Sequence, residues 1–118
     1  MASHIELGRY GEELGRSFLR EQDFDILHVN WKYSFFEIDI IASKDNILHF
    51  IEVKTRRTSE FGLPEESVDR KKMKKLMTAA EEYLYRHPGW KRVQYDILSI
   101  SLKPDQKPEY FFIEDVYI

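Results

Sequence analysis

The sequence predicts an α/β fold in which a mixed β-sheet of about five strands is flanked by two main helices. Apolar residues recur at helical spacing in two segments, one beginning near residue 4 and one ending near residue 87. Five other segments are short and rich in β-branched and aromatic residues. Their order along the chain, α-β-β-β-α-β-β, is typical of a mixed sheet. With 118 residues, of which 42% are hydrophobic and 33% charged, we expect one globular domain over residues 1–118.

The first helix is predicted from a capping-box pattern, Ser3-His4-Ile5-Glu6, which places its start near residue 4. Its core-facing stripe is expected to contain Leu7, Tyr10, Leu14 and Phe18. Each glycine in a helix costs about 1 kcal/mol relative to alanine. The glycines on one flank of the stripe therefore predict close approach to another backbone; they are Gly8, Gly11 and Gly15. Glu12 lies on that flank, so it is either carried toward the packed element or is a solvated surface residue.

The central feature is a predicted β-hairpin, formed by residues 36–42 and 47–54 around a turn at Lys44-Asp45-Asn46. It carries Glu37 and Asp39 on its first strand and Glu52 and Lys54 on its second. Side chains two apart on a strand point to the same face. Charged groups in a buried hairpin need partners, so these four residues predict either a functional site or a structural ion-pair network.

The remaining elements are predicted from turn and capping signals. A strand is expected at Phe24–Trp31, and a second helix with Ser67 as N-cap is expected to end near His87, before Pro88-Gly89. Two further strands are expected, at Val93–Ile100 and Glu109–Ile113. Lys72 and Lys75 lie at the border of the apolar face of the second helix, where a solvated role is the alternative to ligand binding.

The charge is unevenly distributed although the net charge is only −3. Residues 54–80 carry 8 basic and 4 acidic side chains, and this basic segment begins where the charged hairpin ends. It could hold a polyanion without making the whole surface basic. The chain has no cysteine, no apolar run of membrane-spanning length and no signal-peptide pattern, so we expect a cytoplasmic protein without a membrane partner.

Two or three carboxylates with one lysine around a small space suit Mg²⁺ or Mn²⁺, which prefer oxygen ligands. Asp39 and Glu52, on adjacent strands, are the expected ligands, with the Val53 backbone carbonyl as a third. Lys54 is expected to orient a water or to stabilise transition-state charge, and Glu12 to reach the site from the helix. The structural alternative is a network that only fixes strand pairing.

Asp39 followed by Glu52-Val53-Lys54 resembles the PD-(D/E)xK signature of restriction-endonuclease-like nucleases. Nearly the whole chain resembles the YraN-type family of small bacterial endonuclease-like proteins. Matching segments include Gly8-x-x-x-Glu12, Glu37-Ile38-Asp39-Ile40-Ile41-Ala42, Phe50-Ile51-Glu52-Val53-Lys54-x-Arg56, Gly62, Ser67-Val68, Lys72, Lys75 and Ala80-x-x-Tyr83-Leu84. The layout is also similar to that of archaeal Holliday-junction resolvases.

The resemblance implies a restriction-endonuclease-like core with Glu12, Asp39, Glu52 and Lys54 in active-site roles and Glu37 as an additional candidate metal ligand. Two departures from the pattern stand out. Phe36 replaces the glycine that usually precedes Glu-Ile-Asp, and the proline of the nuclease signature is absent.

The leading hypothesis is therefore a Mg²⁺-dependent nuclease that cuts DNA, with branched or recombination and repair intermediates as candidate substrates. Basic side chains are expected to contact phosphates, a sequence-independent and salt-sensitive interaction; they are Arg56, Arg57, Lys72 and Lys75. We see no recognition helix, and we expect most aromatic residues to lie in the core rather than on a base-stacking surface. The alternatives are a non-catalytic nucleic-acid- or partner-binding module and a structural protein. Dimerisation is left open.

Overall fold

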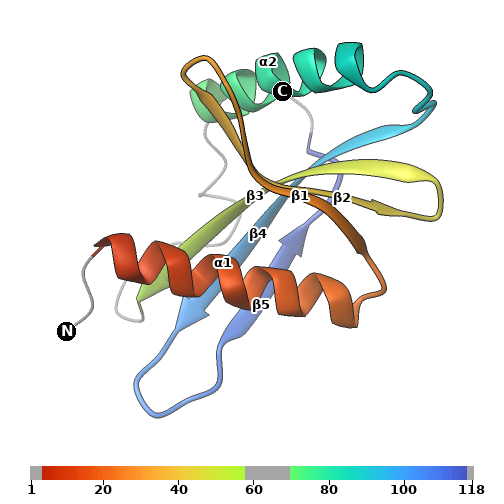
Figure 1. Ribbon diagram of the computed structural model, residues 1–118. Coiled ribbons are helices and arrows are strands. Elements are labelled where there is room, and N and C mark those ends of the chain that lie inside the picture. The colour runs from red at the N-terminus through yellow and green to blue at the C-terminus, as the bar shows by residue number, and fades with distance from the viewer. Residues whose placement is uncertain (1–3, 58–69, 117–118) are drawn as a thin grey trace.

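A computed structural model describes the backbone of residues 4–57 and 70–116, with side chains from Glu6 onward (Figure 1). Its two helices and five strands follow the predicted order, which confirms the mixed α/β fold. The elements are α1 His4–Glu21, β1 Asp25–Tyr33, β2 Phe36–Lys44, β3 Ile47–Arg57, α2 Arg70–Arg86, β4 Val93–Leu102 and β5 Glu109–Ile113. Ser67, the predicted cap of the second helix, lies outside the described residues. Neither helix is long and apolar enough to span a membrane within the described part of the chain.

The strands form one sheet in the order β1-β2-β3-β4-β5. Neighbouring strands are antiparallel except β3 and β4, which are parallel and are joined by the chain segment that contains α2. The predicted hairpin turn between β2 and β3 is confirmed. Asp45 and Asn46 have φ values of 52° and 64°, and a turn with two such residues matches the twist of the flanking strands.

Each face of the sheet carries its own core beneath one helix. Leu48 and Phe50 of β3 pack in the cluster beneath α2, whereas Ile51 and Val53 pack in the cluster beneath α1. The buried residues of α2 are Met73, Leu76, Ala79, Ala80 and Tyr83. Because β3 supplies side chains to both clusters, it is the strand from which charged groups on either face can be positioned.

Helix α1 packs on the sheet along its glycines as well as along part of its predicted apolar stripe, of which Leu14 and Phe18 contact the cluster beneath the helix. Gly11, Gly15 and Leu19, each four residues apart, are buried, whereas Tyr10 is 49% exposed, contrary to the prediction. A Cβ added at Gly11 would lie 1.8 Å from Thr55 Oγ1, and one added at Gly15 would lie 3.4 Å from Val53. The expected close approach therefore occurs at these two positions, although the nearest atoms belong to side chains and not to the backbone that the prediction named. It is wrong for Gly8, where an added Cβ meets nothing within 4 Å.

Strands β2 and β3 separate at one point, and we call the resulting opening the fork. Their ladder runs from the Lys44–Ile47 pair to the Ile40–Ile51 pair and ends there. Beyond that point β2 remains paired with β1 as far as Phe36, while β3 remains paired with β4 as far as Arg57. Figure 1 shows the β1–β2 hairpin curving toward α2 while β3 continues beside β4. The charged residues of the predicted hairpin lie at this fork.

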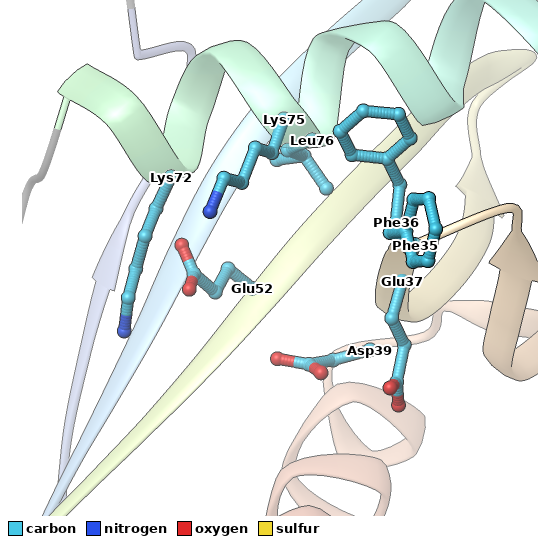
Figure 2. Close-up of a pocket in the computed structure, with 8 residues that line it drawn as sticks. All are labelled: Phe35, Phe36, Glu37, Asp39, Glu52, Lys72, Lys75 and Leu76. Atoms are coloured by element: carbon cyan, nitrogen blue, oxygen red, sulfur yellow. The ribbon is translucent and has the colours of Figure 1, made fainter.

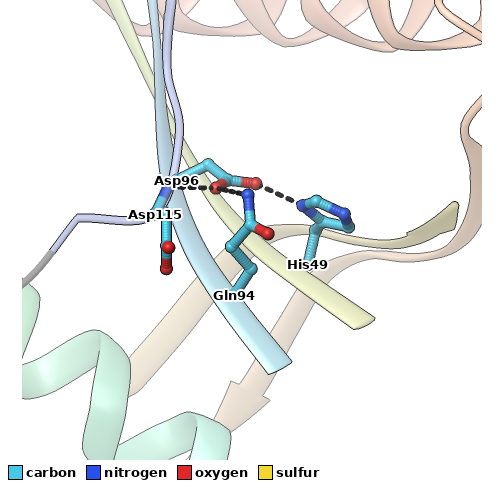
Figure 3. A network of polar contacts seen from close by, with 4 residues as sticks. All are labelled: His49, Gln94, Asp96 and Asp115. Atoms are coloured by element: carbon cyan, nitrogen blue, oxygen red, sulfur yellow. Dashed lines mark hydrogen bonds and ion pairs between the residues drawn. The ribbon is translucent and has the colours of Figure 1, made fainter. Parts of the chain in front are cut away.

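A buried polar network lies in the other half of β3, away from the fork (Figure 3). His49 Nδ1 lies 2.6 Å from Asp96 Oδ2. The other oxygen, Asp96 Oδ1, accepts hydrogen bonds from Gln94 Nε2 at 3.2 Å and from the Asp115 N–H at 2.9 Å. These contacts link β3, β4 and the segment after β5, so the network stabilises the arrangement of the sheet.

Candidate functional site

Asp39 is the first residue of β2 beyond the last ladder pair. Its Oδ2 accepts a hydrogen bond from the Val53 N–H at 2.8 Å. In a continued ladder this N–H would pair with the backbone of β2, so the Asp39 side chain takes the place of a ladder bond at the fork. The N–H and C=O of one strand residue point to the same edge, so the Val53 carbonyl is directed toward the Asp39 side.

Three carboxylates from two elements meet at the fork. Glu12 of α1, and Glu37 and Asp39 of β2, each offer an oxygen atom, and these atoms all lie within 4.8 Å of one another. Glu12 arrives there because the neighbouring Gly11 lets α1 lie against Thr55 of β3. The sequence-based prediction placed Glu12 beside Asp39 from the helix, and the structure brings these two residues together.

Asn30 of β1 connects two of these carboxylates and was missed by the sequence analysis. It lies opposite Asp39, between the Val29–Ile40 and Trp31–Ile38 pairs, and has a φ of 49°. With its amide oriented to give both acceptors a donor, Nδ2 lies 2.9 Å from Glu37 Oε1 and 3.2 Å from Glu12 Oε1. The available signal was an amide between two apolar residues of a predicted strand.

The surroundings of Asp39 disfavour its negative charge. The pKa of Asp39 is raised to about 7, mainly by burial and in addition by the negative charges of Glu52, Glu12 and Glu37, against the opposing hydrogen bond from Val53. At neutral pH this carboxyl group is therefore close to half protonated. A bound cation would favour its ionised form.

A pocket of about 200 Å³ opens beside Asp39 (Figure 2). Acidic groups, two lysines of α2 and two aromatic residues of the β1–β2 hairpin surround it; the lining residues are Phe35, Phe36, Glu37, Asp39, Glu52, Lys72, Lys75 and Leu76. Lys72 and Lys75 extend from α2 toward Glu52 (Figure 2). The two lysines at the border of the second helix thus face the predicted hairpin site.

Glu52 and Lys54 lie on β3 at the edge of this arrangement. Glu52 lines the pocket but is not part of the 4.8 Å group of carboxylates found among the described residues. Lys54 Nζ lies 3.8 Å from Glu52 Oε1, and both side chains are half-buried. Arg56 and Arg57 follow on the same strand and are not among the pocket-lining residues. The group of three carboxylates is therefore formed by Glu12, Glu37 and Asp39. Glu52, the partner of Asp39 favoured by the sequence, shares the pocket with Asp39, and its negative charge also raises the pKa of Asp39.

The donor set at the fork consists of oxygen atoms alone: three carboxylates, with Glu52 and the Val53 carbonyl nearby. Such a set suits a hard divalent cation such as Mg²⁺, which commonly uses one or two carboxylates and completes its octahedron with water and substrate oxygens. The two lysines across the pocket suit a phosphate-containing ligand. The residues present therefore fit a divalent cation.

The model of the uncharacterised protein family UPF0102 matches residues 11–100, which include each candidate site residue. The chain belongs to this family. It is 44% identical over 103 residues to the family member of Dictyoglomus thermophilum, covering 86% of this chain and 87% of that protein. The resemblance to the YraN-type family is thereby confirmed.

Two more distant relatives extend the similarity over nearly the whole chain. The family member of Flavobacterium psychrophilum is 38% identical over 118 residues, covering 99% of this chain and 98% of the relative. That of Rhodococcus opacus is 34% identical over 120 residues, covering 99% of this chain and 100% of the relative. The family membership thus extends over the fork and both helices.

Proposed function

We propose that this protein is a Mg²⁺-dependent nuclease that hydrolyses DNA phosphodiester bonds, with branched recombination or repair intermediates as its substrates. The observation that supports this most directly is the meeting of Glu12, Glu37 and Asp39 at the fork, with oxygen atoms within 4.8 Å. Carboxylates that lie close together repel one another when they are ionised. Here burial and the acidic neighbours together raise the pKa of Asp39 to about 7. Such a group favours the binding of a cation.

Asp39 is the central metal ligand in this proposal, since it contacts the Val53 backbone and lies among the other carboxylates. Glu12 and Glu37 complete one candidate ligand set with Asp39, and Glu52 with the Val53 carbonyl forms a second. Asn30 holds the carboxylates of Glu12 and Glu37 in place through its amide. A bound Mg²⁺ would polarise the phosphodiester and lower the pKa of a water molecule.

Lys54 is the proposed electrostatic catalyst. Its ammonium group lies 3.8 Å from Glu52 Oε1 and is half-buried, so the Glu52 carboxylate, which lines the pocket, orients it. A positive charge fixed near a reacting phosphate stabilises the negative charge that develops on the phosphoryl oxygens. Removal of a single such donor typically lowers the rate about 10²- to 10³-fold.

Lys72 and Lys75 are proposed to hold the DNA backbone on the side of the pocket facing α2. Both are exposed and both line the pocket beside Glu52. Arg56 and Arg57 would extend this contact along β3, beyond Lys54. Phosphate contacts of this kind carry no sequence information, so cleavage is expected to depend on DNA structure and salt rather than on base sequence.

The proposal is tested by calorimetry with Mg²⁺ and Mn²⁺ followed by a cleavage screen on duplex, flap, fork and four-way-junction DNA. Wild type is expected to bind the cation and cut at least one substrate, and Asp39→Ala to lose both properties. Lys54→Ala is expected to bind the cation with nearly unchanged affinity while its cleavage rate falls about 10²-fold or more. A comparison of Glu37→Gln with Glu52→Gln identifies the ligand set, because substitution of a residue that binds the cation lowers the cation affinity of the protein more than substitution of one that does not.

Three outcomes contradict the proposal in different ways. Equal cation binding by wild type and Asp39→Ala rejects the metal site. Cation and DNA binding without cleavage of any substrate favours a non-catalytic binding module. Unfolding of Lys54→Ala and Asp39→Ala under conditions in which wild type is stable would support a purely structural ion-pair network.

A further inference from the structure

Phe35 is displayed to solvent at the tip of the β1–β2 hairpin. Tyr33 and Phe36 pair across the hairpin, so Ser34 and Phe35 alone form its turn. The Phe35 side chain is 98% exposed, the highest value among the exposed large hydrophobic residues of the described chain. Two-residue hairpin turns favour glycine, asparagine and aspartate, which adopt positive φ values readily. Phenylalanine has no such conformational advantage in a turn. The sequence analysis expected most aromatic residues to lie in the core, and Phe35 is an exception to that expectation.

The hairpin that carries Phe35 is fixed against α2. Phe36, which follows Phe35 in the chain, is half-buried against the core cluster beneath α2. The guanidinium group of Arg86 on α2 lies 5.8 Å from the ring centre of Trp31 and 5.7 Å from that of Tyr33, both on β1. Cation–π contacts at this distance are attractive. Phe35 is therefore an exposed ring on a supported element, with little ordering cost when it contacts a ligand.

Phe35 also lines the pocket at the fork. Figure 2 shows Phe35 and Phe36 on one side, Lys72 and Lys75 extending from α2 on another, and Glu37 and Asp39 beneath. An aromatic ring beside two cations fits a ligand that has both a flat π-surface and negative charge. The pocket volume of about 200 Å³ is below the range of pockets that enclose a drug-sized ligand. It therefore suits one group of a longer chain.

We propose that Phe35 stacks on an unpaired base next to the phosphodiester that is held at the fork, and that the protein therefore prefers DNA with a single-stranded segment at that position. This inference rests on the proposed function and specifies its substrate. A base inside a duplex has both faces covered by its neighbours, whereas an unpaired base offers one free face to a ring. Lys72 and Lys75 supply the matching positive charge for the adjoining phosphates.

A second copy of this chain is the competing occupant of the Phe35 surface. The pocket beside the ring is lined by the charged residues Glu37, Lys72 and Lys75 as well as by the apolar residues Phe36 and Leu76. Stable interfaces between proteins bury about 1,200–2,000 Å² and have an apolar centre. A pocket of about 200 Å³ in which three apolar side chains are interspersed with charged ones is too small for such a centre and matches a nucleotide better.

The test measures binding of fluorescein-labelled single strands, splayed forks and blunt duplexes of equal length by fluorescence anisotropy. Ca²⁺ replaces Mg²⁺ because it takes the same oxygen ligands. Phe35→Ala is expected to weaken binding to single-stranded and forked DNA about 5- to 150-fold, the range that corresponds to loss of one base-stacking ring. Binding to blunt duplex DNA is expected to weaken by less than about twofold. Phe35→Trp is expected to retain the preference.

Tyr85→Ala is the matched control, because Tyr85 is 83% exposed and lies on α2 beside Tyr33, outside the pocket at the fork. It is expected to bind all three DNA forms as wild type does. An equal loss for all three DNA forms on Phe35→Ala, or no loss, overturns the stacking proposal. A wild-type dimer that dissociates on Phe35→Ala, measured by light scattering, also overturns it in favour of contact between copies.

The outcome distinguishes this inference from the proposed function. If wild type cuts DNA and Phe35→Ala keeps the same preference for unpaired segments, the stacking role fails and the nuclease activity stands. If binding to forked DNA depends on Phe35 but no substrate is cut, the stacking role stands and the nuclease activity fails. Absence of DNA binding by wild type overturns both.

Discussion

Asp96 and Asp39 are two aspartates of one sheet with opposite surroundings. Asp96 is 0% exposed, and its two oxygens contact His49, Gln94 and the backbone N–H of Asp115. Asp39 is half-buried and accepts a hydrogen bond from the Val53 N–H, but acidic side chains surround it. The first carboxyl group is surrounded by donors and the second by other acids.

This difference separates a structural acid from a candidate ligand-binding acid. Buried polar groups are normally satisfied by partners within the protein, as Asp96 is. The fold places Glu12, Glu37 and Glu52 near Asp39 instead, and their charges raise its pKa. The same negative charges that repel an ionised Asp39 would attract a divalent cation bound beside it. The comparison therefore predicts that the two aspartates respond in opposite ways to substitution, to pH and to metal.

The largest expected effect is on the free energy of unfolding of Asp96→Ala. Removing this carboxylate leaves His49 buried without its partner and the Asp115 N–H without its acceptor, so we expect a loss of about 3–5 kcal/mol. Asp39→Ala removes a group that is repelled by its neighbours, so its unfolding free energy is expected to change by less than about 1 kcal/mol or to rise. Urea denaturation at pH 7.5 without divalent cations measures both.

Cation binding provides the reciprocal readout for the same pair of variants. Asp96→Ala is expected to keep the wild-type affinity for Mg²⁺ at temperatures where it is folded, and Asp39→Ala to lose it. Equal destabilisation by the two substitutions would contradict the distinction, because Asp39 would then belong to a network that fixes strand pairing.

The pH dependence of stability is the next largest effect. The pKa of Asp39 is about 7 in the folded protein and near its ordinary value of 3.8 in the unfolded chain. Between these values the folded state binds more protons, so without cations the unfolding free energy falls as pH rises from about 4 to about 7. The expected fall is about 3 kcal/mol, after allowance for partial solvent exposure, with no further change from this group outside that range.

Asp39→Asn is the control for this slope, because asparagine has the same shape and does not titrate. The difference between wild-type and Asp39→Asn unfolding curves, recorded from pH 4 to pH 8, isolates the contribution of the carboxyl group. Mg²⁺ affinity of wild type is expected to rise over the same interval and to level off above about pH 7.5, since the proton competes with the cation. A wild-type slope that persists in Asp39→Asn would assign the effect to another group.

Much of the fold was predictable because it depends on short-range patterns. The order of the elements, the turn at Asp45-Asn46 and the bounds of β5 follow from side-chain periodicity and turn chemistry. The orientation of α1 was predicted less well. Apolar periodicity placed Tyr10 toward the core, whereas the closest contact follows Gly11 and Gly15, where the absence of side chains lets the helix lie nearest to β3.

The charged residues of the site were predictable, but their arrangement was not. Glu12, Asp39, Glu52 and Lys54 were selected from the sequence, and the first two meet at the fork. At the fork the Asp39 side chain accepts a hydrogen bond from the Val53 N–H where the ladder ends, a competition between side chain and backbone that no periodicity reveals. For the same reason the partnership of Glu37 with Glu12 was not foreseen.

Asn30 and Phe35 show a second limit of sequence reasoning. Asn30 is important because strand register places it opposite Asp39, and Phe35 because a two-residue turn places its ring outside. Both properties belong to the three-dimensional arrangement of the β1–β2 hairpin. In the sequence, Asn30 is only an amide between two apolar residues and Phe35 is one of 8 phenylalanines, so neither residue type indicates this arrangement.

The smallest expected effect tests how α1 sets the environment of Asp39. Gly11→Ala places a Cβ 1.8 Å from Thr55 Oγ1 and 2.8 Å from Thr55 Cβ, so α1 must move away from β3 at a cost of about 1–3 kcal/mol. Gly8→Ala meets nothing within 4 Å and is expected to raise the unfolding free energy by about 0.5–1 kcal/mol through helix propensity.

The consequence for the two aspartates is specific. Glu12 follows Gly11 on α1, so displacement of the helix moves one negative charge away from Asp39 and lowers the pKa of Asp39 toward its ordinary value. Carboxyl ¹³C chemical shifts, followed as a function of pH, are expected to show this change for Asp39 in Gly11→Ala and not in Gly8→Ala, with the Asp96 signal unchanged in both. An unchanged Asp39 titration in a destabilised Gly11→Ala would mean that the sheet alone, through burial and Glu52, sets this pKa and that Glu12 takes no part in the site.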